Sequence, residues 1–184
     1  MIRGLDHFIG AILLAFLCAP LSAEDPGEWE WERIAAENGS FSIEVPCTQE
    51  GVQTDLRGLF AARSMKLDEG AHVVCIRSGV VLIAGQRSEN APEGERTNVL
   101  DQIIADTEGP GKDGVEKTIG EVDGRRALFS REASSDNIAR TAIVEMGPSS
   151  LLMIVAGGPM EEGVAVEDVD AILNRYVASL EVAQ

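Results

Sequence analysis

The chain has 184 residues, of which 31 are acidic and 15 are basic, so its formal net charge is −16. Such a negative surface repels nucleic acid and anionic lipid head groups, and we exclude both as partners. The length suits one domain with its own hydrophobic core, and no linker or internal repeat divides it.

Residues 1–23 have the pattern of a cleaved secretory signal peptide. Arg3 precedes an uncharged apolar run over 8–19, and the small residue Ala23 comes directly before an acidic stretch. The run is shorter than the roughly 20 residues that cross a bilayer, which favours cleavage over an uncleaved anchor. We therefore expect a periplasmic or secreted protein, residues 24–184, with no stable membrane insertion.

Two cysteines, Cys47 and Cys75, remain after this cleavage. An oxidising compartment favours a disulfide between them, and an even number leaves no thiol over. The alternative is two separate small thiols in the core, because free cysteine is often buried.

Strand patterns dominate the first part of the mature chain. Residues 29–34 and 41–45 alternate apolar and polar side chains on either side of an Asn38-Gly39 turn, which predicts a hairpin. Pro46 ends the second strand because it has no amide hydrogen to donate. Further strands are predicted over 59–67, 71–77 and 80–84.

The second half of the chain combines two helices with a meander of strands. Apolar residues recur at helical spacing over 99–104 and again over 169–180, which predicts two amphipathic helices. Asp123-Gly124 predicts a tight hairpin turn between two of the intervening strands. The predicted strands of this half cover 116–120, 126–131, 138–146 and 151–156.

Three of these strands are apolar on both faces, namely 72–76, 80–84 and 151–156. Such strands must be covered on both sides, so we expect them at the centre of a layered structure. Hairpins imply antiparallel pairing, and the helices are segregated from the strands. The predicted fold is α+β: a mainly antiparallel twisted sheet covered by two helices, a helix–sheet–helix sandwich.

The order of elements resembles the PsbP-like group of small exported proteins. The resemblance lies in an N-terminal strand pair that ends with residues 39–46, GSFSIEVP, a twisted meander, and a closing helix that ends with residues 176–180, YVASL. It implies helix–sheet–helix layering and a non-catalytic accessory role. It does not explain the cysteine after Pro46 or the acidic charge, and no binding residue of the group matches a position here.

Catalytic chemistry would have to use His72, the one histidine outside residues 1–23. Cys75 is the nearest nucleophile in sequence, but residues three apart on a strand face opposite sides. No Gly-x-Ser-x-Gly elbow is present to offer a serine. We therefore expect His72 to lie in the core or at its rim, with no catalytic residue in the chain.

Metal and cofactor sites are not predicted either. Two cysteines and one histidine fall short of a closed zinc site, and no acidic run follows the order of a calcium loop. Residues 109–114, GPGKDG, resemble a phosphate-binding loop, but Asp113 stands where a hydroxyl should hold magnesium. A connecting loop is the better interpretation.

Arginines on or beside predicted strands are unusual in so acidic a chain: Arg63, Arg77, Arg87, Arg125, Arg126, Arg131 and Arg140. If several share a sheet face, their forked donors can grip a carboxylate or phosphate. The alternative is cross-strand pairing with the surplus acids. The candidate anion or partner contacts are Arg63, Arg77, Arg126 and Arg140.

Trp29 and Trp31 offer one more candidate surface, because two residues apart on a strand they share a face. They either cap the core or form an exposed aromatic pair for a partner. Together these features predict an exported, non-catalytic accessory domain that binds another protein of the cell envelope. The alternatives are a small-ligand or anion carrier that uses the strand arginines, and a hydrolase with His72 in a cleft.

Overall fold

A computed structural model of the protein describes residues 28–54, 66–88, 98–107, 115–133, 137–159 and 166–183. The predicted signal peptide and most of the predicted strand 59–67 lie outside these residues. The strands are β1 (Glu32–Ala35), β2 (Phe41–Val45), β3 (His72–Arg77), β4 (Val80–Ser88), β5 (Val115–Val122), β6 (Arg125–Ala133), β7 (Asn137–Gly147), β8 (Ser150–Pro159) and β9 (Glu181–Val182). The helices are α2 (Gln49–Thr54), α4 (Val99–Thr107) and α5 (Val166–Ala178).

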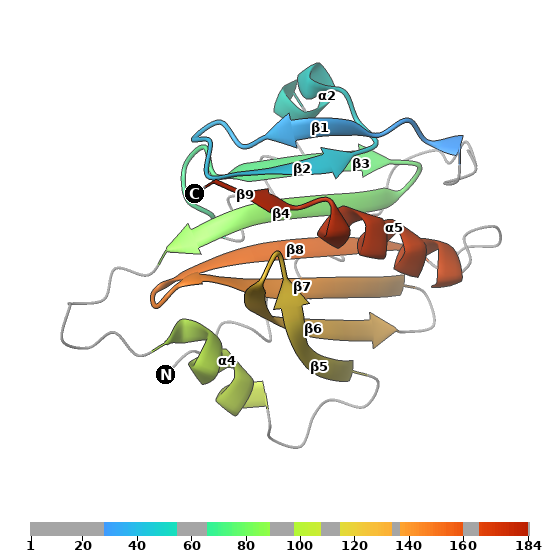
Figure 1. Cartoon of the computed structure of the whole chain (residues 1–184). Helices are drawn as coiled ribbons and strands as arrows, with labels where there is room; N and C mark the ends of the chain where they lie inside the picture. Colours follow the sequence, from blue (N-terminus) through green and yellow to red (C-terminus); the bar gives the residue numbers. More distant parts are fainter. Residues whose placement is uncertain are drawn as a thin grey trace.

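The described residues form an α+β fold in which the strands pair antiparallel in two sheets (Figure 1). The larger sheet has six strands in the order β3-β4-β8-β7-β6-β5, so β3 and β5 are its two edges. The smaller sheet has the order β1-β2-β9 and joins the chain's first hairpin to its last strand. Antiparallel pairing in an α+β fold is therefore confirmed.

Alternate residues of the central strands pack against different helices. On one face, Val144 and Leu152 belong to a core cluster that includes Tyr176 of α5 and Phe41 of the small sheet. On the other face, the neighbouring Ile143 packs with residues of α4. Successive side chains of a strand point to opposite sides, so α5 and α4 cover opposite faces of the sheet.

Side-chain hydrogen bonds hold the first turn of α4 and the last turn of α5. Asn98 caps α4, because its Oδ1 accepts hydrogen bonds from the amides of Leu100 and Asp101 at 2.9 and 3.2 Å. At the far end of α5, Ser179 Oγ donates to the carbonyl of Tyr176 and accepts from the amide of Glu44 in β2. The second contact ties the helix end to the small sheet.

Cys47 and Cys75 are paired as a disulfide, with their Cα atoms 5.9 Å apart, consistent with the predicted pairing. The bond joins the segment after β2 to β3, so it connects the small sheet to one edge of the large one. The loop that it closes also contains the short helix α2, which lies beside β3.

The structure differs from the sequence expectations in four places. The first strand begins at Glu32 and leaves Trp29 and Trp31 before it, because Trp29 turns into the core, 5% exposed. The described residues contain three helices where two were expected, and a second, smaller sheet where one sheet was expected. The doubly apolar β3 is an edge strand, and it is buried because α2 lies beside it, the disulfide ties it to the small sheet, and its side chains pack in hydrophobic clusters on both faces of the sheet.

Within the part of the chain described here, no helix is long and apolar enough to cross a membrane.

Candidate functional site

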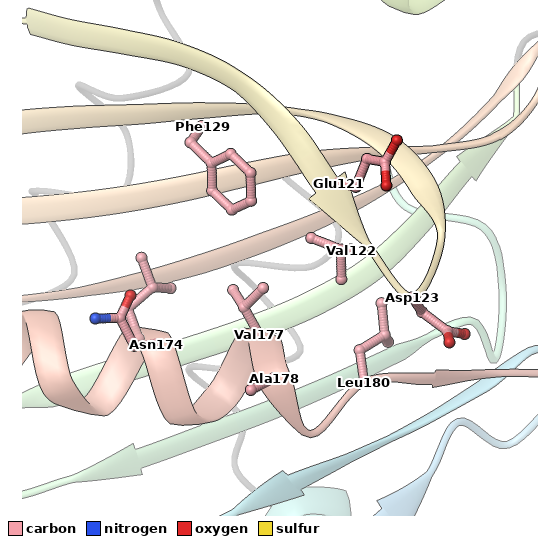
Figure 2. A pocket seen from close by; sticks show the side chains of 9 residues that line it. Glu121, Val122, Asp123, Phe129, Asn174, Val177, Ala178 and Leu180 are labelled. Atoms are coloured by element: carbon pink, nitrogen blue, oxygen red, sulfur yellow. The ribbon is translucent and has the colours of Figure 1, made fainter.

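A groove lies between the last turns of α5 and the β5–β6 hairpin (Figure 2). It encloses about 390 Å³ and opens to solvent on one side. Apolar side chains line most of it, and three polar residues stand at its rim. The lining consists of Glu121, Val122, Asp123, Phe129, Leu173, Asn174, Val177, Ala178 and Leu180.

The floor of the groove is continuous with the hydrophobic core. Val122, Leu173 and Leu180 are 5–6% exposed, and Phe129 and Val177 pack beside them as partly buried side chains. The groove therefore exposes the margin of the main core at a point where the sheet and the helix diverge.

The sequence forms the hairpin wall through its turn. Asp123 and Gly124 have φ values of 49° and 68°, and two successive positive φ values are typical of a type I′ turn. This turn brings Glu121 and Asp123 to the groove while Val122 points into the core. A Cβ at Gly120 would lie 3.1 Å from Phe129 Cε2, so this glycine gives the Phe129 ring room to form part of the floor.

The helix wall is held in place at the other end of α5. Arg140 of β7 donates from Nε to Asp170 Oδ1 at 2.6 Å, and its Nη2 lies 2.5 Å from Asp170 Oδ2. Arg131 of β6 reaches the same carboxylate at 4.0 Å. The hydrogen bond from Arg140 holds the pKa of Asp170 below its usual value against the opposing effect of burial, and the positive charges of Arg140 and Arg131 act in the same direction. The first turns of α5 are thus fastened to the sheet.

The electrostatics of the groove are one-sided. Glu121 and Asp123 are exposed on the hairpin beside the groove, with their carboxylates directed away from α5 (Figure 2), and Asn174 adds an exposed amide on the helix wall. Among the described residues, no basic side chain lines the groove. With a net charge of −16 on the chain, this rim favours cationic groups.

Of the arginines singled out in the sequence, Arg131 and Arg140 meet at Asp170, but the candidate contacts Arg77, Arg126 and Arg140 do not converge on one site among the described residues. Arg126 pairs with Asp101 of α4 at 2.5 Å, whereas Arg140 pairs with Asp170 of α5 on the opposite face. Arg77 donates to the carbonyl of Pro46 at 3.0 Å. Arg63 lies outside the described residues.

The two tryptophans occupy different environments. Arg77 lies over the buried ring of Trp29, 5.6 Å from its centroid, so this tryptophan caps the core. Trp31 is half-buried, and the Arg175 guanidinium lies 4.4 Å from its ring centroid. They form no exposed aromatic pair.

His72 lies half-buried on β3 and faces away from Cys75, which belongs to the core cluster on the other side of the sheet. The disulfide also leaves Cys75 without a nucleophilic thiol. No group of three or more possible metal ligands lies together in the described part of the chain.

Sequence reasoning missed the groove residues, although it predicted both elements that carry them. The Asp123-Gly124 turn and the helical stripe with Leu173 and Val177 were visible in the sequence. Their proximity was not, because it depends on how β5 twists toward α5. The sequence contains only two separate signals for the groove, an acidic turn and an apolar stripe on the last helix, and neither indicates that the two lie together.

Comparisons with known proteins identify no family. No family model matches the sequence, and no curated protein matches it. The solved structures that resemble the fold include the Ran-binding protein Mog1p of Saccharomyces cerevisiae and a protein of Bacteroides thetaiotaomicron. Mog1p has 12% sequence identity and a TM-score of 0.47, over 84% of this chain and 96% of that chain. The second has 11% identity and a TM-score of 0.45, over 83% of this chain and 48% of that chain. Values this low assign no function.

Proposed function

We propose that this protein is an exported, non-catalytic accessory domain of the cell envelope that binds a partner protein. The binding site is the groove between α5 and the β5–β6 hairpin. One observation carries the proposal: a solvent-open groove of about 390 Å³ with an apolar floor, beside a hairpin that carries two exposed carboxylates. Margins of the core that remain accessible in this way are typical of interaction sites.

The chemistry of the groove favours a basic partner segment. An apolar side chain would contact Leu173 and Phe129, and lysine or arginine beside it would meet Glu121 and Asp123. Charge complementarity of this kind steers encounter and selects against acidic partners. The net charge of −16 extends the same preference over the whole surface.

Export remains part of the proposal. It is supported by the pattern of residues 1–23 and by the Cys47–Cys75 pair, which suits an oxidising compartment. The packing of α4 and α5 on opposite faces supports the helix–sheet–helix sandwich that the PsbP-like resemblance implies. Intact-mass analysis of protein recovered from the periplasm tests export, with Glu24 as the expected first residue; a retained leader contradicts cleavage.

Site-specific crosslinking tests the groove. A photo-reactive phenylalanine at Asn174 would point into the groove, and the same group at Ala171 is the control, because both residues are exposed on α5 but only Asn174 lines the groove. We expect one envelope protein to crosslink at Asn174 and not at Ala171. Equal crosslinking at both positions contradicts the proposal.

Blocking the groove gives the quantitative test with the identified, purified partner. Ala178→Trp places a large side chain in the groove, whereas Ala171→Trp makes the same change two turns earlier on the same stripe of α5. Ala178→Trp should weaken binding at least tenfold, and Ala171→Trp and His72→Ala should leave it unchanged. Unchanged affinity for Ala178→Trp contradicts the groove as the site.

A further inference from the structure

The outer edge of β5 forms part of the same groove. Strand β5 is the last strand of the six-stranded sheet and pairs only with β6. Its end, Glu121 and Val122, lines the groove opposite α5. Figure 2 shows the end of β5 and the helix on either side of the cavity, so an occupant would lie between a sheet edge and a helix.

The register of the hairpin shows which backbone groups face outward. Val122 and Arg125 flank the two-residue turn, and residues at this position exchange hydrogen bonds across the ladder. Because inward and outward groups alternate along an antiparallel edge strand, Gly120 points to β6. The amides and carbonyls of Glu121 and Ile119 therefore point away from the sheet.

These outward groups have no hydrogen-bond partner among the described residues. In the small sheet, β2 extends beyond its short neighbour β9, and there the outward amide of Glu44 donates a hydrogen bond to Ser179 Oγ at 2.9 Å. At β5 no side chain in the described part of the chain plays this role.

Ile119 gives the second, independent observation. It is 60% exposed, and it is the only large hydrophobic side chain among the described residues that is exposed to solvent. It lies on the face of β5 that points away from the groove floor, since it pairs with Leu128, which packs toward α4. A strand added to β5 would cover Ile119 with a cross-strand neighbour while its alternate residues entered the groove.

We propose that the partner's segment binds in an extended conformation and adds a seventh strand to the sheet along β5, with alternating apolar and basic residues. The inference rests on the proposed function, because it specifies how the groove is occupied. Main-chain pairing to Ile119 and Glu121 supplies affinity that does not depend on sequence, and the acidic rim and apolar floor select the side chains.

Hydrogen exchange tests the strand directly. The probe is the synthetic pentapeptide Lys-Val-Lys-Val-Lys with blocked ends, and the control probe is Glu-Val-Glu-Val-Glu. At saturation the first should slow amide exchange of Ile119 and Glu121 by at least about tenfold, and the second should not bind. Probe contacts at Leu173 and Val177 without slowed exchange would overturn strand addition and leave the groove as the site. Equal binding of both probes would overturn the charge preference.

Two variants at one position separate the amide from the charge. Glu121→Gln and Glu121→Pro both remove the carboxylate, but only proline removes the outward amide. An outward-facing position on an edge strand tolerates proline. We expect Glu121→Gln to weaken the first probe by up to about fivefold, and Glu121→Pro to weaken it by about a further tenfold. Equal affinities would overturn the proposal, and if Glu121→Pro does not fold, the exchange measurement on the natural protein decides.

A second copy of this chain is the competing occupant. Sedimentation of the protein alone distinguishes it: a monomer with fast-exchanging Ile119 and Glu121 amides supports an external partner. A dimer in which these two amides are protected without probe would overturn the basic partner. Failure of the crosslink at Asn174 would instead contradict the proposed function, so the two failures are distinguishable.

Discussion

The two edges of the six-stranded sheet are completed in different ways. At the β3 edge, Val73, Val74 and Cys75 are all 1–2% exposed, α2 lies alongside, and the disulfide to Cys47 ties the edge to the small sheet. At the β5 edge, four successive residues over 116–119 are exposed, and no further described strand follows. One edge is closed within the chain and the other faces solvent.

The charges on the two edges differ in the way that would protect an open edge of an acidic protein from aggregation. An open strand edge attracts other strands, and charged side chains are a common protection. Strand β5 has Glu116, Lys117 and Glu121 among its eight residues, whereas β3 has a single charged residue, Arg77, at its end. These charges oppose unselective pairing, yet the two glutamates would be complementary to a basic segment.

The largest expected effect follows from breaking the closed edge. Replacing both cysteines, Cys47→Ala with Cys75→Ala, removes a cross-link between residues 28 positions apart. The chain-entropy model for a loop of this size gives a loss of ~3.6 kcal/mol in the free energy of unfolding. Urea denaturation of the oxidised natural protein and the double variant measures it. A difference below about 1 kcal/mol would mean that non-covalent contacts alone close the β3 edge.

A threonine on the closed edge should have the next largest effect. Val74→Thr places a hydroxyl at a position 2% exposed between Ile83 and its neighbours. Burying an unpaired hydroxyl without a change of volume should cost ~1–2 kcal/mol of stability. Thermal unfolding provides the measurement, and Val74→Ile, which keeps the site apolar, is the control. A neutral result for Val74→Thr would mean that this edge opens to water.

An ionic contact holds α5, one wall of the groove, to the sheet, and the stability of the protein should therefore depend on pH. The pKa of Asp170 is lowered in the folded state by its bond to Arg140, so this carboxylate stabilises the fold above its ordinary value near 3.8. That contribution is lost as the pH falls through the lowered pKa. Asp170→Asn should lower the free energy of unfolding by about 1 kcal/mol at pH 7. At a pH below the lowered pKa of Asp170, the variant and the natural protein should be equally stable. A stability difference that does not change with pH would show that Asp170 acts by packing alone.

The smallest effect is expected at the open edge itself. Ile119→Thr makes a change similar to Val74→Thr, but at a side chain 60% exposed, so stability should change by less than about 0.5 kcal/mol. Chemical denaturation of the two variants in parallel compares the two edges directly. A loss as large as that of Val74→Thr would show that β5 is already covered in the isolated protein.

Most elements could be predicted from the sequence because their patterns are local. Alternation over 41–45, the Asp123-Gly124 turn and the apolar stripe of the last helix depend only on residues a few positions apart, and all three are confirmed. The short strand β9 and helix α2 were missed. Two residues of strand have too little periodicity to recognise, and β9 forms only because it pairs with β2.

The site was harder to predict, because arginines on neighbouring strands do not have to share a face. Arg126 and Arg140 lie on strands that pair directly, yet they contact helices on opposite sides of the sheet. Their side is set by register, and a shift of one residue reverses it. Arginine content therefore indicates ion pairs but not the face of the sheet on which each of them lies.

The sequence by itself determined the acidic charge, the antiparallel strands, the two amphipathic helices and the pair of cysteines, because each is a property of composition or of near neighbours. Only the tertiary structure decided which strands became the edges and that the β5–β6 hairpin and α5 would line one groove. The doubly apolar β3 illustrates the reason. Its apolar residues predict that both faces are buried, but they do not predict whether its edge pairs with another strand. Every residue offers the same backbone donor and acceptor whether or not a neighbouring strand uses them.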